Sequence, residues 1–182
     1  GCQFHWRNRG YRDFQDFLDA FTAKRRKNIN RERRLVREAG LELRMQSGAA
    51  LTESQWPTVH QFYRSTFDRL GGVATLTLPF FQEIATTLGE RLQVVLAFAE
   101  GREVAAAICL RSDSTLYGRH WGCRADYDSL HFEACYYQGL DYCIQQGLQG
   151  FEPGAQGEHK IYRGFLPVFT HSAHWIADPG FR

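Results

Sequence analysis

The chain has 182 residues, of which 43% are hydrophobic and 23% are charged, and its formal net charge is +2. This length supports one domain with a sizeable core, and the composition excludes a disordered or a fibrous protein. The longest apolar runs, residues 94–99 and 104–110, are far shorter than the roughly 20 residues that cross a bilayer, so no membrane span is expected.

The first 45 residues predict two helices and a strand. Apolar residues recur at helical spacing over 14–21, where Asp13 could cap an amphipathic helix. Residues 22–39 form a second, mostly polar helix for which Gly40 is a natural end. Residues 41–45 alternate between apolar and polar side chains, which is typical of a strand.

The second helix concentrates positive charge. Residues 22–39 contain eight basic and two acidic residues, a net charge of +6, which leaves −4 for the rest of the chain. Such a segment suggests an anionic partner such as tRNA. The candidate phosphate contacts are Arg25, Arg26, Lys27 and Arg31. The alternative is a solvated face on which Glu32 and Glu38 make local pairs.

The remaining chain predicts two further helices and then a sheet. A helix over 54–70 would begin at Ser54 as N-cap, with Pro57 in its first turn, and a connection over 71–77 leads to a helix over 78–89. The later expected elements are strands at 92–100, 103–112, 115–122, 150–153 and 168–176, a helix at 129–147, and a helix that starts near 157.

This order predicts the fold class. A meander followed by a strand–helix–strand crossover gives an α/β (α+β) fold with a mixed central sheet and helices on both faces. That layout resembles the GNAT acyl-CoA N-acyltransferase fold.

Several stretches resemble the Fem-type aminoacyltransferases, GNAT-fold enzymes that add amino acids to peptidoglycan precursors. These are KRRKNINRERRLVREAGLELR (24–44) and HKIYRGF (159–165). The bacterial FemAB-related peptidoglycan biosynthesis/recognition family is closer still, through FHWRN (4–8), LYGRHWGC (116–123), LHFEACYYQ (130–138) and FEPGAQGEHK (151–160). The resemblance covers nearly the whole chain.

The resemblance implies an N-acyltransferase that moves an acyl or aminoacyl group onto an amine of a peptidoglycan precursor. Family members are roughly twice this size, so the chain is expected to be one GNAT-like domain, the C-terminal partner of an N-terminal half. The expected donor is acyl-CoA or aminoacyl-tRNA. Acyl-CoA users carry a glycine-rich pyrophosphate loop, whereas residues 122–132 lack that cradle and contain Asp126 and Asp128, which argues against CoA.

Residues 151–165 contain the densest group of catalytic side-chain types. Acyl transfer to an amine needs a base and a group that stabilises the oxyanion. The predicted catalytic residues are Glu152 or His159 as base, with Lys160 as an anion-binding group. Glu152 ends a strand, where burial could raise its pKa. Arg163, three residues after Lys160, would share its helix face and bind substrate.

The same segment allows a structural interpretation, in which Glu152 or Glu158 pairs with Lys160 or Arg163. Residues 154–157 are better explained as a turn than as a phosphate loop, although free N–H groups after Gly157 could bind an anion. The further predicted substrate contacts are Gln156, Glu158, His120 and Trp121.

Two other interpretations remain open. His120, Cys123, His131 and Cys135 have side chains that can bind zinc, but they fit packed core residues equally well, and no metal is predicted. Glu133 should be a helix-dipole residue or a buried partner of Arg119. For the whole chain, the alternative to an enzyme is a non-catalytic module that binds a cell-wall fragment or an anionic ligand.

The cysteines bear on the compartment. There are five, an odd number with no C-x-x-C pair, which is typical of free thiols in a reducing compartment. The first residues contain no apolar segment of a signal peptide. We therefore expect a cytoplasmic protein.

Overall fold

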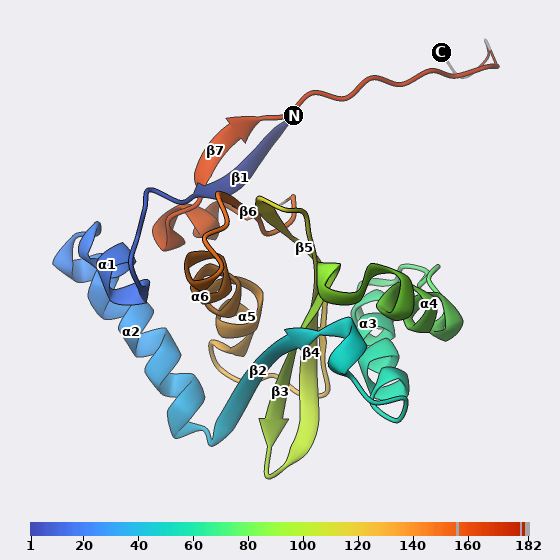
Figure 1. Cartoon of the computed structure of the whole chain (residues 1–182), viewed down its shortest axis with the longest axis horizontal. Coiled ribbons are helices and arrows are strands. Elements are labelled where there is room, and N and C mark those ends of the chain that lie inside the picture. Colours follow the sequence, from blue (N-terminus) through green and yellow to red (C-terminus); the bar gives the residue numbers. More distant parts are fainter. Residues whose placement is uncertain (156, 179, 181–182) are drawn as a thin grey trace.

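A seven-stranded mixed sheet forms the centre of the computed structural model, which describes residues 1–155, 157–178 and 180 (Figure 1). The strands are β1 (Cys2–Arg7), β2 (Leu41–Ser47), β3 (Leu92–Ala99), β4 (Arg102–Arg111), β5 (Thr115–Cys123), β6 (Gly150–Glu152) and β7 (Leu166–Phe169). They lie in the order β2-β3-β4-β5-β6-β1-β7. Only the β5–β6 pair is parallel.

Helices cover both faces of this sheet, as the sequence predicted. The α-helices are α1 (Phe14–Asp19), α2 (Ala23–Glu38), α3 (Trp56–Leu70), α4 (Leu78–Leu88), α5 (Leu130–Phe132) and α6 (Gln138–Gln145). A π-helix, η3 (Glu133–Tyr137), joins α5 to α6, and the short 3-10 helices are η1 (Gly48–Ala50), η2 (Gly89–Arg91) and η4 (Glu158–Arg163). No helix in the described part of the chain is both long and apolar enough to cross a membrane.

The alternation of side chains along β3 and β4 creates two cores. Val94 and Leu96 point to the face that α3 and α4 cover, whereas Val95 and Ala97 point to the opposite face. Figure 1 shows α3 and α4 on one side and α1, α2, α5 and α6 on the other. Both faces of the central strands are therefore buried, which explains why these strands are continuously apolar.

Local signals explain most helix ends. The Asp13 side chain accepts a hydrogen bond from Asp16 N, as predicted for the cap of α1. Pro57 lies in the first turn of α3, but the residue before that helix is Gln55 and not the predicted Ser54. The helix α3 ends on Gly71, whose φ of 70° suits a residue without a side chain.

The two ends of the chain differ from the prediction. β1 was not foreseen, and it pairs with β6 and β7 from the far end of the sequence. The strand predicted over 168–176 ends at Phe169 in the structure, because its partner β1 begins at Cys2 opposite that residue. Residues 171–178 are exposed and extend away from the body (Figure 1).

Candidate functional site

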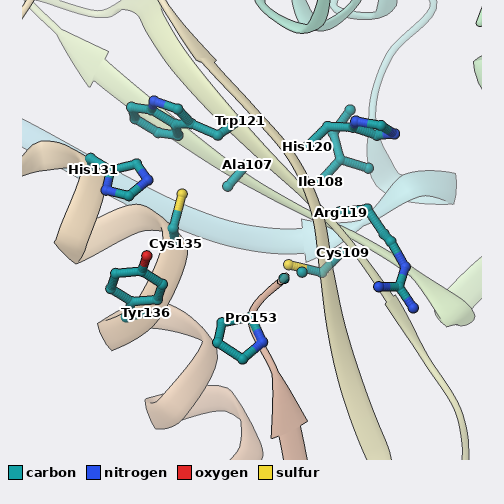
Figure 2. A pocket seen from close by; sticks show the side chains of 12 residues that line it. Ala107, Ile108, Cys109, Arg119, His120, Trp121, His131, Cys135, Tyr136 and Pro153 are labelled. Atoms are coloured by element: carbon teal, nitrogen blue, oxygen red, sulfur yellow. The ribbon is translucent and has the colours of Figure 1, made fainter. Parts of the chain in front are cut away.

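The parallel strands β5 and β6 separate after three paired residues, and a cavity of about 110 Å³ lies where they part (Figure 2). At the point of separation the backbones are close, because a Cβ on Gly118 would lie 3.2 Å from Pro153 Cα. The cavity is lined by Ala107, Ile108, Cys109, Gly118, Arg119, His120, Trp121, His131, Cys135, Tyr136, Pro153 and Gly154. None of these residues is a carboxylate.

A β-bulge in β5 shapes one wall. Ile108 pairs with His120 and Cys109 pairs with Gly118, so Arg119 is the additional residue. The extra residue of a bulge is left out of the ladder, and Arg119 is among the residues that line the cavity. Figure 2 shows His120 and Trp121 projecting to opposite sides of β5.

Two histidines at the cavity are held neutral. The His131 ring lies edge-on to Trp121, with 5.5 Å between ring centroids. Burial, with the charges of His159, Arg163 and Lys160 as further causes, lowers the pKa of His131 to about 4. Burial also lowers the pKa of His120, whose ring lies 4.7 Å from that of Tyr63 on α3. Arg163 and Lys160 therefore place positive charge near the cavity, and its two imidazoles are neutral at pH 7.

A hydrogen-bonded pair connects the cavity to solvent. The Tyr136 hydroxyl lies 3.0 Å from Nε2 of His159, and His159 is exposed. Burial raises the pKa of Tyr136, so the phenol keeps its proton at neutral pH, and burial together with Arg163 and Lys160 lowers the pKa of His159. Gly157 is needed beside this pair, because a Cβ there would lie 2.4 Å from His159 Cε1.

Lys160 is a buried ammonium next to the same cavity. Its residue is only 2% exposed, and Nζ donates a hydrogen bond of 2.7 Å to the carbonyl of Gly154. Nζ also lies 6.0 Å from the Tyr136 ring centroid. No carboxylate of the described residues forms an ion pair with it. Burial lowers the pKa of Lys160 from its ordinary value.

Arg163 holds η4 against α2. Its Nη2 lies 2.6 Å from Glu32 Oε1 and its Nε lies 3.2 Å from Oε2, while Nη1 donates to the carbonyl of His159. The guanidinium also stacks on Phe132, with Cζ 3.5 Å from the ring centroid. The Tyr137 hydroxyl donates to Glu32 as well. All three guanidinium nitrogens of Arg163 therefore donate to protein oxygens, which makes it a positioning residue.

The other predicted residues of this segment lie outside the cavity lining. Glu152 faces β1, where Oε1 is 3.9 Å from Nδ1 of His5. Glu158 is exposed at the start of η4, and Gln156 lies outside the described residues. The structural pairing expected between Glu152 or Glu158 and Lys160 or Arg163 is wrong, because Arg163 finds its carboxylate on α2. The predicted helix after residue 157 is instead a 3-10 helix, in which Lys160 and Arg163 are eclipsed.

The basic helix divides into exposed and buried parts. Lys27 and Arg31 are exposed, Arg26 donates to the carbonyl of Phe21, and Arg25 lies over the Tyr162 ring at 5.6 Å. Glu38 pairs with Arg34 across one helical turn, as in the solvated-face interpretation. Glu32 does not pair locally.

Of the two roles expected for Glu133, helix-dipole residue or buried partner of Arg119, the pairing with Arg119 is wrong. Its carboxylate lies 3.1 Å from Arg33 Nη2, and Arg33 also meets Asp141 at 2.7 Å. Burial raises the pKa of Glu133. Arg33, which belongs to the basic segment 22–39, is therefore neutralised inside the fold by Glu133 and Asp141.

The four zinc candidates do not converge on one point. His131 and Cys135 line the cavity, while the His120 ring packs against α3 on the other side of β5 (Figure 2). Within the described ranges, no group of three or more His, Cys, Asp or Glu side chains could hold a metal ion.

The sequence suggested roles for Arg119 and Glu32 other than those in the structure, and it did not single out Tyr136. Its position fits the apolar face of the helix predicted over 129–147, so nothing in the sequence marks its hydroxyl as functional. Its hydroxyl could be assigned only once the π-helix η3 placed it against His159.

Comparisons with known proteins agree with this architecture. A family model described as FemAB-like, peptidoglycan biosynthesis/recognition, matches residues 1–182. A search of the curated proteins finds no match.

Solved structures share the fold at low identity. The crystal structure of FemX has a TM-score of 0.66 at 11% identity, over 91% of this chain and 59% of that one. The structure of L-PGS from Bacillus licheniformis has a TM-score of 0.60 at 12% identity, over 85% of this chain and 46% of that one. The structure of a possible acetyltransferase from Clostridium difficile 630 has a TM-score of 0.55 at 11% identity, over 76% of this chain and 99% of that one. The chain spans about half the length of L-PGS, and its fold is GNAT-like.

Proposed function

The chain belongs to the FemAB-like family of peptidoglycan biosynthesis and recognition, and on that premise we propose that it transfers an acyl or aminoacyl group onto an amine of a peptidoglycan precursor. The neighbours named FemX and L-PGS, together with the acetyltransferase, support a transferase. In our proposal, the reacting carbonyl enters the opening between β5 and β6. Open sheets bind ligands where neighbouring strands part.

The observation that carries this proposal is the buried ammonium of Lys160. A buried cation without a carboxylate partner is costly, and it is retained where a negative charge develops nearby. Nζ uses one donor on the Gly154 carbonyl, and Gly154 lines the cavity. The remaining Nζ donors, with the backbone of Arg119 at the bulge, would stabilise the oxyanion of the tetrahedral intermediate.

The Tyr136–His159 pair supplies the proton route. The acceptor amine attacks the carbonyl carbon, a C–N bond forms, and the bond from that carbon to the leaving oxygen or sulfur breaks. Tyr136 keeps its proton at neutral pH and donates it to the leaving group, and His159 returns a proton to Tyr136 from solvent. The proton lost by the amine goes to solvent or to the neutral imidazole of His131.

We propose an aminoacyl ester of tRNA as the donor in preference to acyl-CoA. The turn between β5 and α5 carries exposed Asp126 and Asp128, whose negative charges would repel a pyrophosphate at this position. The exposed basic residues of α2 offer phosphate contacts instead.

The test combines purified protein and a peptidoglycan precursor with radiolabelled aminoacyl-tRNA in one arm and labelled acetyl-CoA in another. We expect label on the precursor in the tRNA arm. Lys160→Met, which keeps the length of the side chain, should lower kcat by roughly 10²–10³. Arg102→Met, at the exposed start of β4 and away from α2, is the control and should keep kcat within about twofold.

Three results would count against the proposal. Full kcat in the Lys160→Met variant removes Lys160 from the mechanism. Transfer from acetyl-CoA alone replaces the tRNA donor. Binding of the precursor without transfer from either donor favours the non-catalytic module.

A further inference from the structure

The end of the molecule formed by η4, β7 and the segment after β7 exposes several large apolar side chains. Phe169 is 85% exposed and Trp175 is 82% exposed, and the side chains of Tyr162 and Leu166 are exposed as well. We call these four residues the aromatic edge. Exposed apolar side chains that gather in one region mark a surface that binds another protein or a membrane.

The chain that carries most of the aromatic edge has no ionised side chain over a long stretch. Residues 164–177 contain no Asp, Glu, Lys or Arg, although 23% of the whole chain is charged. Within this stretch, residues 171–177 are exposed and extend away from the body (Figure 1). An exposed segment usually keeps charged residues in water. This segment can instead enter a less polar medium without removing a charge from water.

Positive charge lies directly beside the aromatic edge. Arg7, Arg9 and Arg25 line one cavity together with Leu166, and no carboxylate lines it. None of the three arginines forms an ion pair with an Asp or Glu in the described part of the chain. The Arg25 guanidinium lies 5.6 Å from the centroid of the Tyr162 ring. We call the three arginines the arginine rim, and the protein itself does not neutralise their charge.

The arginine rim is separate from the face of α2 that carries Lys27 and Arg31. At 3.6 residues per turn, Lys27 lies about 200° and Arg31 about 240° around the helix axis from Arg25. Arg25 therefore faces η4, in agreement with its contact to Tyr162. The exposed basic face of α2 points elsewhere, so an anion on that face and a partner at the arginine rim would not compete for the same side chains.

The shape of this end favours a bilayer over a protein partner. The aromatic edge belongs to a strand at the border of the sheet and to a segment that extends from it (Figure 1). It therefore protrudes, whereas a specific protein interface needs a matching surface of about 800 Å² on each partner. A bilayer needs no matching shape. Trp and Tyr side chains are enriched at the membrane–water interface, and basic residues are attracted to anionic lipids.

We propose that the aromatic edge and the arginine rim bind the surface of an anionic phospholipid bilayer. Phe169 and Trp175 enter the boundary between head groups and acyl chains, while Arg7 and Arg9 meet lipid phosphates. The binding is reversible and of the order of that of a single acyl chain, about 10⁴ M⁻¹. The inference does not rest on acyl transfer, because the surface would bind lipid whether or not the cavity between β5 and β6 is catalytic.

The test is co-sedimentation with vesicles of phosphatidylcholine alone and of phosphatidylcholine mixed with phosphatidylglycerol, at low and at high salt. We expect binding to the anionic vesicles that weakens at high salt, and much weaker binding to phosphatidylcholine alone. Tryptophan fluorescence reports insertion, since Trp6 and Trp56 are buried and Trp175 is exposed. The anionic vesicles should shift the emission to shorter wavelength, and Trp175→Phe should abolish most of the shift.

Matched variants locate the surface. Phe169→Ser should lower the partition coefficient roughly tenfold, because a large apolar side chain no longer leaves water. Arg9→Gln should lower it roughly fivefold, the effect of one basic residue near an anionic surface. Val73→Ser removes a side chain that is 78% exposed in the connection between α3 and α4, and Arg102→Gln removes an exposed charge at the start of β4. Both controls should change the coefficient by no more than about twofold.

Four results would overturn the proposal. The first is no binding to anionic vesicles, and the second is an emission that these vesicles leave unchanged. The third is equal weakening by Phe169→Ser and Val73→Ser. The fourth is a dimer in lipid-free sedimentation that Phe169→Ser dissociates, because the aromatic edge would then be an interface between two copies of the chain. Equal binding to both kinds of vesicle removes the arginine rim from the proposal.

Discussion

Replacing Glu32 with glutamine tests whether the ion pair between α2 and η4 holds the catalytic segment in place. The Glu32 carboxylate accepts hydrogen bonds from Nη2 of Arg163 at 2.6 Å and from Nε of Arg163 at 3.2 Å. It also accepts one from the hydroxyl of Tyr137. The Arg163 side chain is 8% exposed and that of Glu32 is 22% exposed. The substitution therefore leaves a buried guanidinium without its counter-charge.

The expected cost follows from this geometry. Breaking a fully buried pair costs about 3–5 kcal/mol, and the partial exposure of Glu32 reduces this to about 2–3 kcal/mol. For a chain of 182 residues, that loss corresponds to a Tm lower by roughly 4–12 °C. Transfer activity should fall further than the folded fraction, because His159 and Lys160 lie on the element that Arg163 anchors.

The assay is thermal unfolding by circular dichroism beside the transfer assay. Glu38→Gln is the control, since Glu38 pairs with Arg34 on the surface, where both side chains are 60% exposed. That exposed pair should contribute no more than about 0.5 kcal/mol. If Glu32→Gln lowers Tm no more than Glu38→Gln, the ion pair does not hold η4. The double variant with Arg163→Met should recover part of the lost stability, because the unpaired charge is then gone.

Three other changes test separate parts of the site. Tyr136→Phe should lower kcat by about 10², with little change in Tm, and an unchanged kcat would exclude the phenol as proton donor. Because the pKa of His131 is lowered from 6.5 to about 4, the folded state binds this proton less readily than the unfolded chain, so urea unfolding should show stability falling as pH drops from 6.5 towards 4. His131→Gln should flatten that fall, and an identical pH profile in the variant would refute it. Gly122→Ala should prevent folding, since its Cβ would lie 1.7 Å from Phe62 O, whereas a soluble variant with a native Tm would contradict the packing of α3 on β5.

Periodicity in the sequence predicted the central architecture. The helices over 54–70 and 78–89 and the hairpin around Gly101 appear with ends within a few residues of the expectation. Each of these helices buries one stripe of its residues, and the two hairpin strands are buried on both faces. The order of apolar and polar residues within each segment therefore identifies it. The fold class followed from their order, and the FemAB-like stretches predicted the family that the comparison shows.

Contacts between distant segments were not predictable in the same way. β1 has only six residues, and its partners lie more than 140 residues away along the chain, so no local signal marks it as a strand. The partners of Arg163 and Glu133 were expected from neighbours in sequence, but both lie on α2. A charge run such as 22–39 contains no local mark that separates Glu32 and Arg33, which turn inward, from Lys27, which stays in water.

The sequence alone determined the types of element, their order, and the segment 151–165 as the place where chemistry-bearing side chains gather, because these depend on local periodicity and residue type. Only the tertiary structure decided what each side chain does. Glu152 turned towards β1, Lys160 became a buried ammonium at the Gly154 carbonyl, and Arg163 became an anchor. These roles depend on which elements pack together, and so on the distances between residues that are far apart along the chain.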